Sequence, residues 1–362
     1  MEASQNMEQL LKKLVDEQRE STGLVGLGAI IIQDEKIFGP VVNGKRRKGK
    51  EASLTGEDLW HIGSVTKSFT ATMIARLVEK GKLNWNTTIK EIFPEVNSLN
   101  AGWYNVTLQH LLTHTSGAVA NFPFLVNFKN PSEGLERMGA RESAVIKILK
   151  KEPKTELGST FEYSNVGYTI AGVIAEKVTG KPWEELINQE VFIPLKIQKG
   201  GFGPPQNTDK ELSQPRGHRN LFGLLTIAVD SQDDNTPIIG PAGTIHLSLS
   251  DLSLFASEHL KGLQGKGTLL KPETFQRLHK TSLDDYACGW IVDSPKDLAV
   301  GPVLWHNGSN TMWYTLLAII PNINTVVAIT SNDGNFDVAE QCAWEIIEKV
   351  VQNKHNRVAK GL

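Results

Sequence analysis

The sequence predicts an α+β fold, in which an antiparallel sheet is flanked by the N- and C-terminal helices and stands beside an all-helical lobe. Strand-like segments occur near both ends of the chain, helix-like segments fill the middle, and an amphipathic helical pattern lies at each end. The simplest arrangement pairs the strands of the two ends in one sheet. We therefore expect a sheet domain from residues 1–83 and 244–362, a helical lobe from residues 84–243, and a functional site between them.

The N-terminal part begins with a helix and a hairpin. Apolar residues recur at helical spacing within residues 1–20, which predicts an amphipathic helix. Segments 25–32 and 36–42 are rich in β-forming residues and are separated by a polar turn, which predicts a hairpin. Residues 64–80 carry one apolar stripe followed by Gly81, a pattern typical of a helix and its C-terminal stop.

The middle of the chain has mostly helical patterns, whereas the C-terminal part is mostly strand-like. Residues 200–243 are rich in Gly, Pro and Asp, which favours loops. Residues 338–351 form an amphipathic pattern that predicts a closing helix. The other predicted helices are at residues 107–114, 144–150, 168–180, 183–191 and 247–260. Strands bounded by Pro, Asn and Gly are predicted at residues 286–292, 303–306, 313–320 and 325–330.

The composition is that of an ordinary globular protein, with 40% hydrophobic and 22% charged residues. The net charge of −2 gives no attraction to nucleic acid or acidic membranes. Two cysteines, Cys288 and Cys342, are too few for a disulfide framework and are expected to be buried free thiols. No apolar run is long enough to span a bilayer. We expect a soluble chain, cytoplasmic as given, or periplasmic or secreted if a leader peptide has been removed.

The residues Ser64-Val65-Thr66-Lys67 are the central motif. Positions i and i+3 share a face of a helix, so the Lys67 amine can reach the Ser64 hydroxyl. At the start of a helix, Ser64 also lies near exposed backbone N–H groups and the positive end of the helix dipole. That environment suits a nucleophile whose attack creates an oxyanion. Taken alone, Ser64 is more typical of an ordinary helix N-cap than of a nucleophile.

Two further motifs follow along the chain. Tyr163-Ser164-Asn165 lies before a predicted helix, and His306-Asn307-Gly308-Ser309 lies at the end of a predicted strand. Taken singly, the first is typical of a polar turn and the second of a strand-end turn, since Asn-Gly is the commonest turn pair. The occurrence of all three motifs in this order favours one shared site.

In this order, Ser-x-x-Lys, Tyr-x-Asn and His-x-Gly resemble the motifs of the serine β-lactamase superfamily. The branch resembled is that of class C β-lactamases, D-alanyl-D-alanine carboxypeptidases and esterases of β-lactamase fold. The resemblance runs over residues 25–351. It is supported by His-Ile-Gly-Ser at 61–64, Leu-Leu-Thr-His-Thr-Ser-Gly at 111–117, Pro-Ala-Gly at 241–243 and Trp-His-Asn-Gly at 305–308.

The resemblance implies the β-lactamase/transpeptidase-like fold and a role for each motif residue. Ser64 would be acylated and then released by water or another acceptor, and the backbone N–H groups of Ser64 and Ser309 would form the oxyanion hole. Whether Lys67 is the base, or stays charged and lowers the pKa of Tyr163, is left open. The implied catalytic residues are Ser64, Lys67 and Tyr163, and the implied substrate- or oxyanion-binding residues are Asn165, His306, Gly308 and Ser309.

His306 departs from the family pattern, because β-lactamases and many carboxypeptidases carry lysine there. Lysine supplies a permanent cation for a substrate carboxylate, whereas an exposed imidazole is mostly neutral at pH 7. We therefore expect a serine hydrolase that works through an acyl-enzyme on Ser64. Its expected substrates are carboxylic esters or peptide-like amides, with weak or promiscuous β-lactam hydrolysis.

Two alternatives exist on the same fold. A penicillin-binding or peptidoglycan-fragment sensor would show little turnover, and an acyltransferase would pass the acyl group to an alcohol or amine. No cofactor or metal is expected, because Leu111 stands where a zinc protease needs glutamate between His110 and His114. The expected partner is a small-molecule ester, amide or β-lactam and not a nucleic acid; the oligomeric state stays open.

Overall fold

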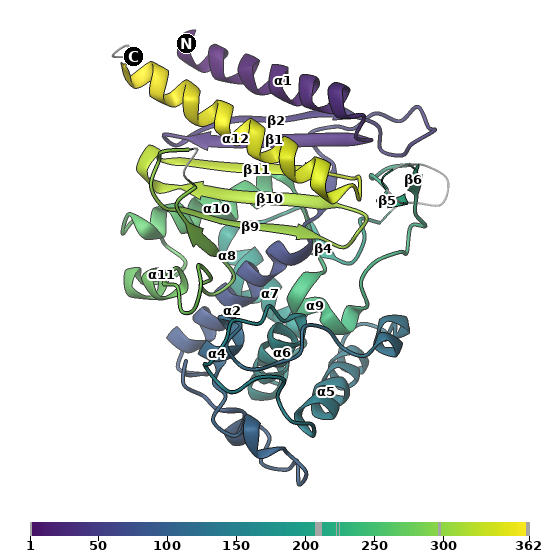
Figure 1. The fold of residues 1–362 in the computed structure, drawn as a ribbon, viewed down its shortest axis with the longest axis vertical. Coiled ribbons are helices and arrows are strands. Elements are labelled where there is room, and N and C mark those ends of the chain that lie inside the picture. Colours follow the sequence, from purple (N-terminus) through teal and green to yellow (C-terminus); the bar gives the residue numbers. More distant parts are fainter. Residues whose placement is uncertain (1, 207–211, 222, 224, 296–297, 360–362) are drawn as a thin grey trace.

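The computed structural model describes residues 2–206, 212–221, 223, 225–295 and 298–359, and its main layer is a six-stranded antiparallel sheet (Figure 1). The strand order is β2-β1-β11-β10-β9-β8, so strands from the two ends of the chain share one sheet, as predicted. The strands are β1 (Gly26–Gln33), β2 (Lys36–Gly44), β8 (Ile291–Asp293), β9 (Val303–Ser309), β10 (Tyr314–Ile320) and β11 (Thr325–Ser331).

Two long helices cover one face of this sheet. α1 (Glu2–Thr22) and α12 (Phe336–Ala359) run side by side across it (Figure 1). Gln18 of α1 donates a 2.7 Å hydrogen bond to Glu345 of α12. Their apolar faces are buried against β1, β10 and β11 in one core cluster. Both terminal helices are thus part of the core that supports the sheet.

The other face of the sheet packs on α10 (Leu249–Leu263), and α2 (Thr66–Glu79) lies between the sheet and the helical lobe (Figure 1). Phe69 of α2 stacks on Phe255 of α10 with ring centroids 3.7 Å apart, and both rings are fully buried. α11 (Pro272–Leu278) packs beside them. Since this second core cluster continues into the lobe, α2 is fixed by contacts from both sides.

The helical lobe is built around α6 (Asn165–Thr179). The buried Arg141 guanidinium ties the lobe together, because it donates to the carboxylates of Glu176 and Glu184, the latter at 2.7 Å. A buried charge is tolerated when it is paired in this way. The other elements are α3 (Ile89–Ile92), η2 (Ala101–Trp103), α4 (Leu108–Leu112), η3 (Phe124–Phe128), α5 (Leu135–Leu149), α7 (Trp183–Ile187), η4 (Asn188–Phe192) and α8 (Ile193–Leu195).

Short strands also occur where loops are predicted. β4 (Gly200–Phe202) pairs with β7 (Ile245–Ser248), which pairs in turn with β3 (Leu59–His61). Close packing explains β4, because a Cβ on Gly200 would lie 2.5 Å from the Leu247 side chain. Tertiary contact, not β propensity, makes this strand. Other short elements are β5 (His218–Leu221), β6 (Leu225–Ala228), η5 (Pro237–Ile239), α9 (Gly240–Gly243) and η6 (Pro321–Ile323).

Several predicted boundaries shift for similar reasons. The strand predicted at 303–306 continues to Ser309, because Asn307 and Gly308 pair with β10 and this pairing overrides their turn propensity. The strand predicted at 286–292 is confined to β8, and the helix predicted at 247–260 begins only after β7. The helix predicted at 168–180 begins earlier, as α6, because Ser164 caps it.

Cys288 and Cys342 are free and buried, as predicted. Within the described residues, no helix combines the length and apolar character that a bilayer span requires. No group of three or more His, Cys, Asp or Glu side chains in the same part of the chain is arranged to hold a metal ion.

Candidate active site

Ser64 lies in a single 3-10 turn, η1 (Gly63–Val65), that leads into α2. The α-helix begins at Thr66 and not at Ser64, but the expected i, i+3 contact is present. Lys67 Nζ lies 3.0 Å from Ser64 Oγ. Ser64 is partly exposed whereas Lys67 is fully buried. The turn therefore presents the hydroxyl to solvent with the amine beneath it.

Two oxygen acceptors hold Lys67 in addition to Ser64. Nζ lies 2.7 Å from Asn165 Oδ1 and 2.8 Å from the Ala242 carbonyl oxygen. Asn165 in turn donates through Nδ2 to Asn121 at 2.8 Å, which fixes the orientation of its amide. No carboxylate is among the described contacts of Nζ. Burial therefore acts unopposed and lowers the pKa of Lys67 well below its ordinary value.

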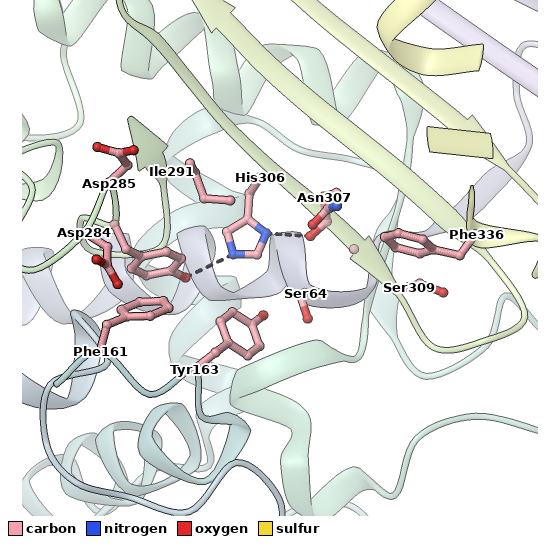
Figure 2. A pocket seen from close by; sticks show the side chains of 12 residues that line it. Ser64, Phe161, Tyr163, Asp284, Asp285, Ile291, His306, Asn307, Ser309 and Phe336 are labelled. Carbon is pink, nitrogen blue, oxygen red and sulfur yellow. Dashed lines mark hydrogen bonds between the residues drawn. The ribbon is translucent and has the colours of Figure 1, made fainter. Parts of the chain in front are cut away.

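Tyr163 lies beside this pair. Lys67 Nζ is 4.7 Å from the centroid of its ring, and the hydroxyl is turned toward Ser64 (Figure 2). Burial raises the pKa of Tyr163 above its ordinary value, although a hydrogen bond with Ser64 partly offsets this effect. The structure thus brings Ser64, Lys67, Tyr163 and Asn165 together.

The block at 111–117 positions Tyr163, a role that the sequence does not reveal. His114 has φ +58, a left-handed conformation uncommon for a residue with a side chain. Its carbonyl oxygen accepts from the Glu162 N–H at 2.8 Å, and its Nδ1 accepts from the Ser164 N–H at 3.1 Å. Both neighbours of Tyr163 are therefore bonded to one histidine.

The nucleophile turn packs backbone to backbone against β9. A Cβ on Gly308 would lie 2.5 Å from the Ser64 nitrogen, and one on Gly63 would lie 2.4 Å from the Ser309 nitrogen. Only glycine permits an approach this close. The approach places the backbone of Ser64 beside that of Ser309, as the oxyanion hole implied by the family resemblance requires.

Gly308→Ala should lower kcat by about 10²- to 10³-fold, the loss typical when an oxyanion donor is removed. The new Cβ would meet the Ile62 carbonyl oxygen at 2.1 Å and so push the strand away from the turn. Steady-state kinetics with a chromogenic ester, together with thermal unfolding, would measure the effect. The control Gly139→Ala lies in α5 with nothing within 4 Å of its new Cβ. A Gly308→Ala enzyme with the kcat of this control would contradict the prediction.

His306 differs from the sequence expectation of an exposed imidazole, because only 2% of its surface is exposed. Nδ1 lies 2.5 Å from the Asn307 carbonyl oxygen, which can only accept, so Nδ1 carries the proton. Nε2 then accepts from the Tyr286 hydroxyl at 3.0 Å. Burial lowers the pKa of His306 to about 3. The expectation of an exposed ring is therefore wrong, and burial keeps the imidazole neutral at pH 7.

Acid should destabilise the protein through its buried histidines. Burial lowers the pKa of His306 and His279 to about 3 and that of His246 to about 4, from an ordinary 6.5. Below about pH 6.5 the unfolded chain therefore binds protons that the folded chain does not. As the pH is lowered below about 6.5, the free energy of unfolding should fall by about 1.4 kcal/mol per pH unit for each histidine. The fall ends when the pH reaches the pKa of that histidine in the folded protein.

Denaturant-induced unfolding measured between pH 7 and pH 5 would test this dependence. In His279→Asn the free energy of unfolding should fall less steeply as the pH is lowered, by about 1.4 kcal/mol per pH unit, because one buried histidine is missing. A free energy of unfolding that is constant over this range, or a slope unchanged in the variant, would contradict the prediction.

A buried histidine–carboxylate pair braces the same turn. His61 Nε2 lies 3.0 Å from Asp234 Oδ1, and both side chains are buried. The Gly63 N–H donates to His61 Nδ1 at 3.1 Å, and the Asn310 amide donates to Asp234 at 2.7 Å. The pair thus connects the residue before Ser64 with the residue after Ser309. Sequence reasoning did not identify it, although His61 stands in the His-Ile-Gly-Ser block.

Two cavities meet at Ser64 and Ser309, which line both. The first measures about 520 Å³ and the second about 400 Å³. The first is mostly aromatic and apolar, and its other wall residues include Phe161, Tyr163, Asp284, Asp285, Tyr286, Ile291, His306 and Phe336. The second is polar, and its wall residues include Asn121, Asn127, Asn165, Arg219, Asp234, Asn235 and Asn310.

Comparison with known proteins identifies the family and the fold of the chain. Penicillin-binding protein 4 from Amycolatopsis lactamdurans is 24% identical over 307 residues, which are 81% of this chain and 77% of that protein. The chain spans 63% of the length of other relatives that it matches. The structure of an octameric penicillin-binding protein homologue from Pyrococcus abyssi superposes with a TM-score of 0.76 at 21% identity, covering 94% of this chain and 77% of that one.

A D-amino acid amidase from Ochrobactrum anthropi SV3 superposes with a TM-score of 0.74 at 18% identity, covering 96% of this chain and 99% of that one. These likenesses confirm the predicted fold. The family model for Beta-lactamase matches residues 11–351, which include the whole range of residues 25–351 over which the motifs predict the resemblance. The chain therefore belongs to the Beta-lactamase family.

Proposed function

We propose that the chain is a serine hydrolase that forms an acyl-enzyme on Ser64 and cleaves carboxylic esters or peptide-like amides. The observation that carries this proposal is the 3.0 Å contact between a fully buried Lys67 amine and the partly exposed Ser64 hydroxyl. Burial of a lysine without a carboxylate partner is costly, so such a group is characteristic of functional sites. The hydroxyl lines both cavities, where a substrate can reach it.

Lys67 fits the role of general base. A neutral amine has two N–H donors and one lone pair. The Asn165 and Ala242 oxygens take the two donors, which leaves the lone pair for the Ser64 proton. Burial also lowers the pKa of Lys67 and raises that of Tyr163, so a neutral lysine is easier to form than a tyrosinate. These observations support Lys67 as base, with Tyr163 passing the proton to the leaving group.

The proposed cycle has two steps. In acylation, Ser64 Oγ bonds to the substrate carbonyl carbon, and the oxyanion faces the N–H groups of Ser64 and Ser309. The bond to the leaving oxygen or nitrogen then breaks as that atom receives the proton through Lys67 and Tyr163. In deacylation, water gives a proton to the same groups as it attacks the acyl carbon. The bond from that carbon to Ser64 Oγ then breaks, the carboxylic acid leaves, and the proton returns to Oγ.

The neutral His306 supports esters and amides over β-lactams. A penicillin carries a carboxylate next to its leaving nitrogen, and a permanently charged lysine would attract it. A buried neutral imidazole supplies no such charge. The D-amino acid amidase among the structural neighbours also supports hydrolysis of an amide. We therefore propose weak or promiscuous β-lactam turnover.

Time-resolved product release with p-nitrophenyl acetate, nitrocefin and a D-alanyl peptide would test the function. We expect steady turnover of the ester after any initial burst and slower turnover of nitrocefin. Release that stops at one equivalent per protein would favour a penicillin-binding sensor. A transfer product formed on adding an alcohol or amine would favour an acyltransferase. The absence of any release from all three would contradict the proposal.

A further inference from the structure

The two cavities differ in which candidate catalytic residue they contain. Tyr163 lines only the first cavity, and Asn165 lines only the second. A group that protonates the leaving atom must lie within hydrogen-bond reach of it. Because Tyr163 holds that role in the proposed function, the leaving group lies in the first cavity. The acyl group, bonded to Ser64, then extends into the second.

The first cavity is apolar near Ser64 and acidic at its far end. Figure 2 shows Asp284 and Asp285 beyond Phe161 and on the side of the cavity away from Ser309. Both aspartates are exposed. Neither Lys nor Arg is among the described lining residues, and His306 is neutral. The charge that a leaving group meets in this cavity is therefore negative.

Backbone contacts hold the two aspartates in place. Asp284 has φ +52, in the left-handed region that Asp and Asn adopt more readily than other side chains. The Asp285 carbonyl oxygen accepts from the Val292 N–H at 2.7 Å, and Tyr286 forms a β-bridge with Ile291. The turn that carries the carboxylates is thus anchored to β8, so their position in the wall is defined.

The second cavity is polar, whereas the first is mostly apolar and acidic at one end. Its described charged residues are Arg219, which is exposed, and Asp234, whose carboxylate lies 3.0 Å from His61 Nε2 and accepts a hydrogen bond from the Asn310 amide. The rest of its polar wall consists largely of asparagine amides. Such a wall suits an acyl group with hydrogen-bonding or anionic substituents.

We propose that the leaving group of the substrate is apolar or aromatic next to the scissile bond and neutral or cationic at its far end, while the acyl group is polar. This assignment rests on the proposed function. It implies that a leaving group with a carboxylate is disfavoured. The neutral His306 suggests the same for β-lactams, and the acidic wall extends this to every substrate whose leaving group is anionic. A single exposed ion pair contributes little free energy. Attraction of a cationic leaving group and repulsion of an anionic one nevertheless act in the same direction on the ratio of kcat/KM between the two substrates.

A matched series of phenyl acetates would test the charge preference. The para substituent would be CH₂CH₂N(CH₃)₃⁺, CH₂CH₂CONH₂ or CH₂CH₂CO₂⁻, so that the charge varies while the two methylenes insulate the ester. We expect kcat/KM to fall in that order, with a cation-to-anion ratio of about tenfold at low ionic strength. The ratio should shrink in high salt, because salt screens exposed charges. A ratio of one or below would overturn the proposal.

Asp284→Asn combined with Asp285→Asn should bring this ratio close to one. Asparagine keeps the left-handed turn at position 284, so the change removes charge and not shape. The control Glu273→Gln removes an exposed charge on α11, which lines a different cavity, and should keep the wild-type ratio. A ratio that persists in the double variant would show that other groups cause it and would overturn the assignment.

A pair of cavity-filling variants would test which cavity takes which part. Ile291→Trp, in the first cavity, should lower the ratio of kcat/KM for a bulky leaving group to that for a bulky acyl group. Asn127→Trp, in the second cavity, should raise the same ratio. If Ile291→Trp instead raised this ratio and Asn127→Trp lowered it, the assignment of the two cavities would be reversed.

The phenyl acetate with the neutral CH₂CH₂CONH₂ substituent distinguishes failure of the proposed function from failure of the leaving-group assignment. If Ser64→Ala still hydrolyses it at the wild-type rate, the proposed function fails. If hydrolysis depends on Ser64 but the cation-to-anion ratio is one, the proposed function stands and the leaving-group assignment alone is wrong.

Discussion

Ser64→Ala should lower kcat/KM for every hydrolysed ester by about 10⁴-fold or more, because the proposed acyl-enzyme forms on this oxygen. Loss of a nucleophile has effects of this size in serine hydrolases, where the oxyanion hole and binding leave only residual catalysis. The rate with p-nitrophenyl acetate, corrected for spontaneous hydrolysis, would measure it. The fold should persist, since Ser64 is partly exposed and the substitution removes only its hydroxyl oxygen and keeps Cβ.

Mass spectrometry after treatment with a fluorophosphonate would locate the nucleophile directly. The adduct should lie on the peptide that contains Ser64 and be absent from Ser64→Ala. Ser68→Ala provides a control on the same helix, because the Ser68 hydroxyl is buried and donates to the Gly289 carbonyl oxygen at 2.6 Å. An adduct that moves or disappears in Ser68→Ala, or that persists in Ser64→Ala, would overturn the assignment.

Lys67→Ala and Tyr163→Phe should each lower kcat by about 10²- to 10⁴-fold, the range expected when a proton-transfer group is lost. Because both residues are proposed to handle the same proton, their losses should not multiply. The double variant is therefore expected to be about as slow as the slower single variant. Kinetics of all four proteins with one ester, in a double-mutant cycle, would measure the coupling.

The pH dependence of kcat/KM in the same variants would show which residue is the base. If Lys67 is the base, the pH dependence of kcat/KM on its acidic side should change in Lys67→Ala and be kept in Tyr163→Phe. Fully multiplicative losses in the double variant would show that the residues act independently. A pH profile altered only in Tyr163→Phe would favour tyrosinate as the base.

The sequence predicts the local parts of the site well. The Ser64–Lys67 contact follows from helical spacing, which needs no tertiary information. Strands with a continuous apolar run in their middle, such as β10 and β11, are recognised because both of their faces are buried. The contact between Tyr163 and this pair required the family resemblance, since about a hundred residues separate them along the chain.

Features that depend on distant partners were missed. His306 looks like an exposed turn residue in the sequence, but the partner strand β10 and the Tyr286 hydroxyl bury it. The pair of His61 and Asp234 joins residues far apart in the sequence, and neither has a local pattern that announces the other. The acidic wall of the first cavity is invisible for the same reason, because Asp284 and Asp285 read as an ordinary surface turn.

The position of β1 between β2 and β11 has a consequence for the order in which the molecule is made. Every residue of β1 is buried, and Ser331 of β11 donates to the Gly26 carbonyl oxygen across a separation of 305 residues. During synthesis, this apolar strand therefore shows an open hydrogen-bonding edge until nearly the whole chain has emerged from the ribosome. Pairing at such a separation also makes folding slow. The growing chain thus depends on protection of β1, by chaperones or by transient local contacts, until its last partner strand arrives.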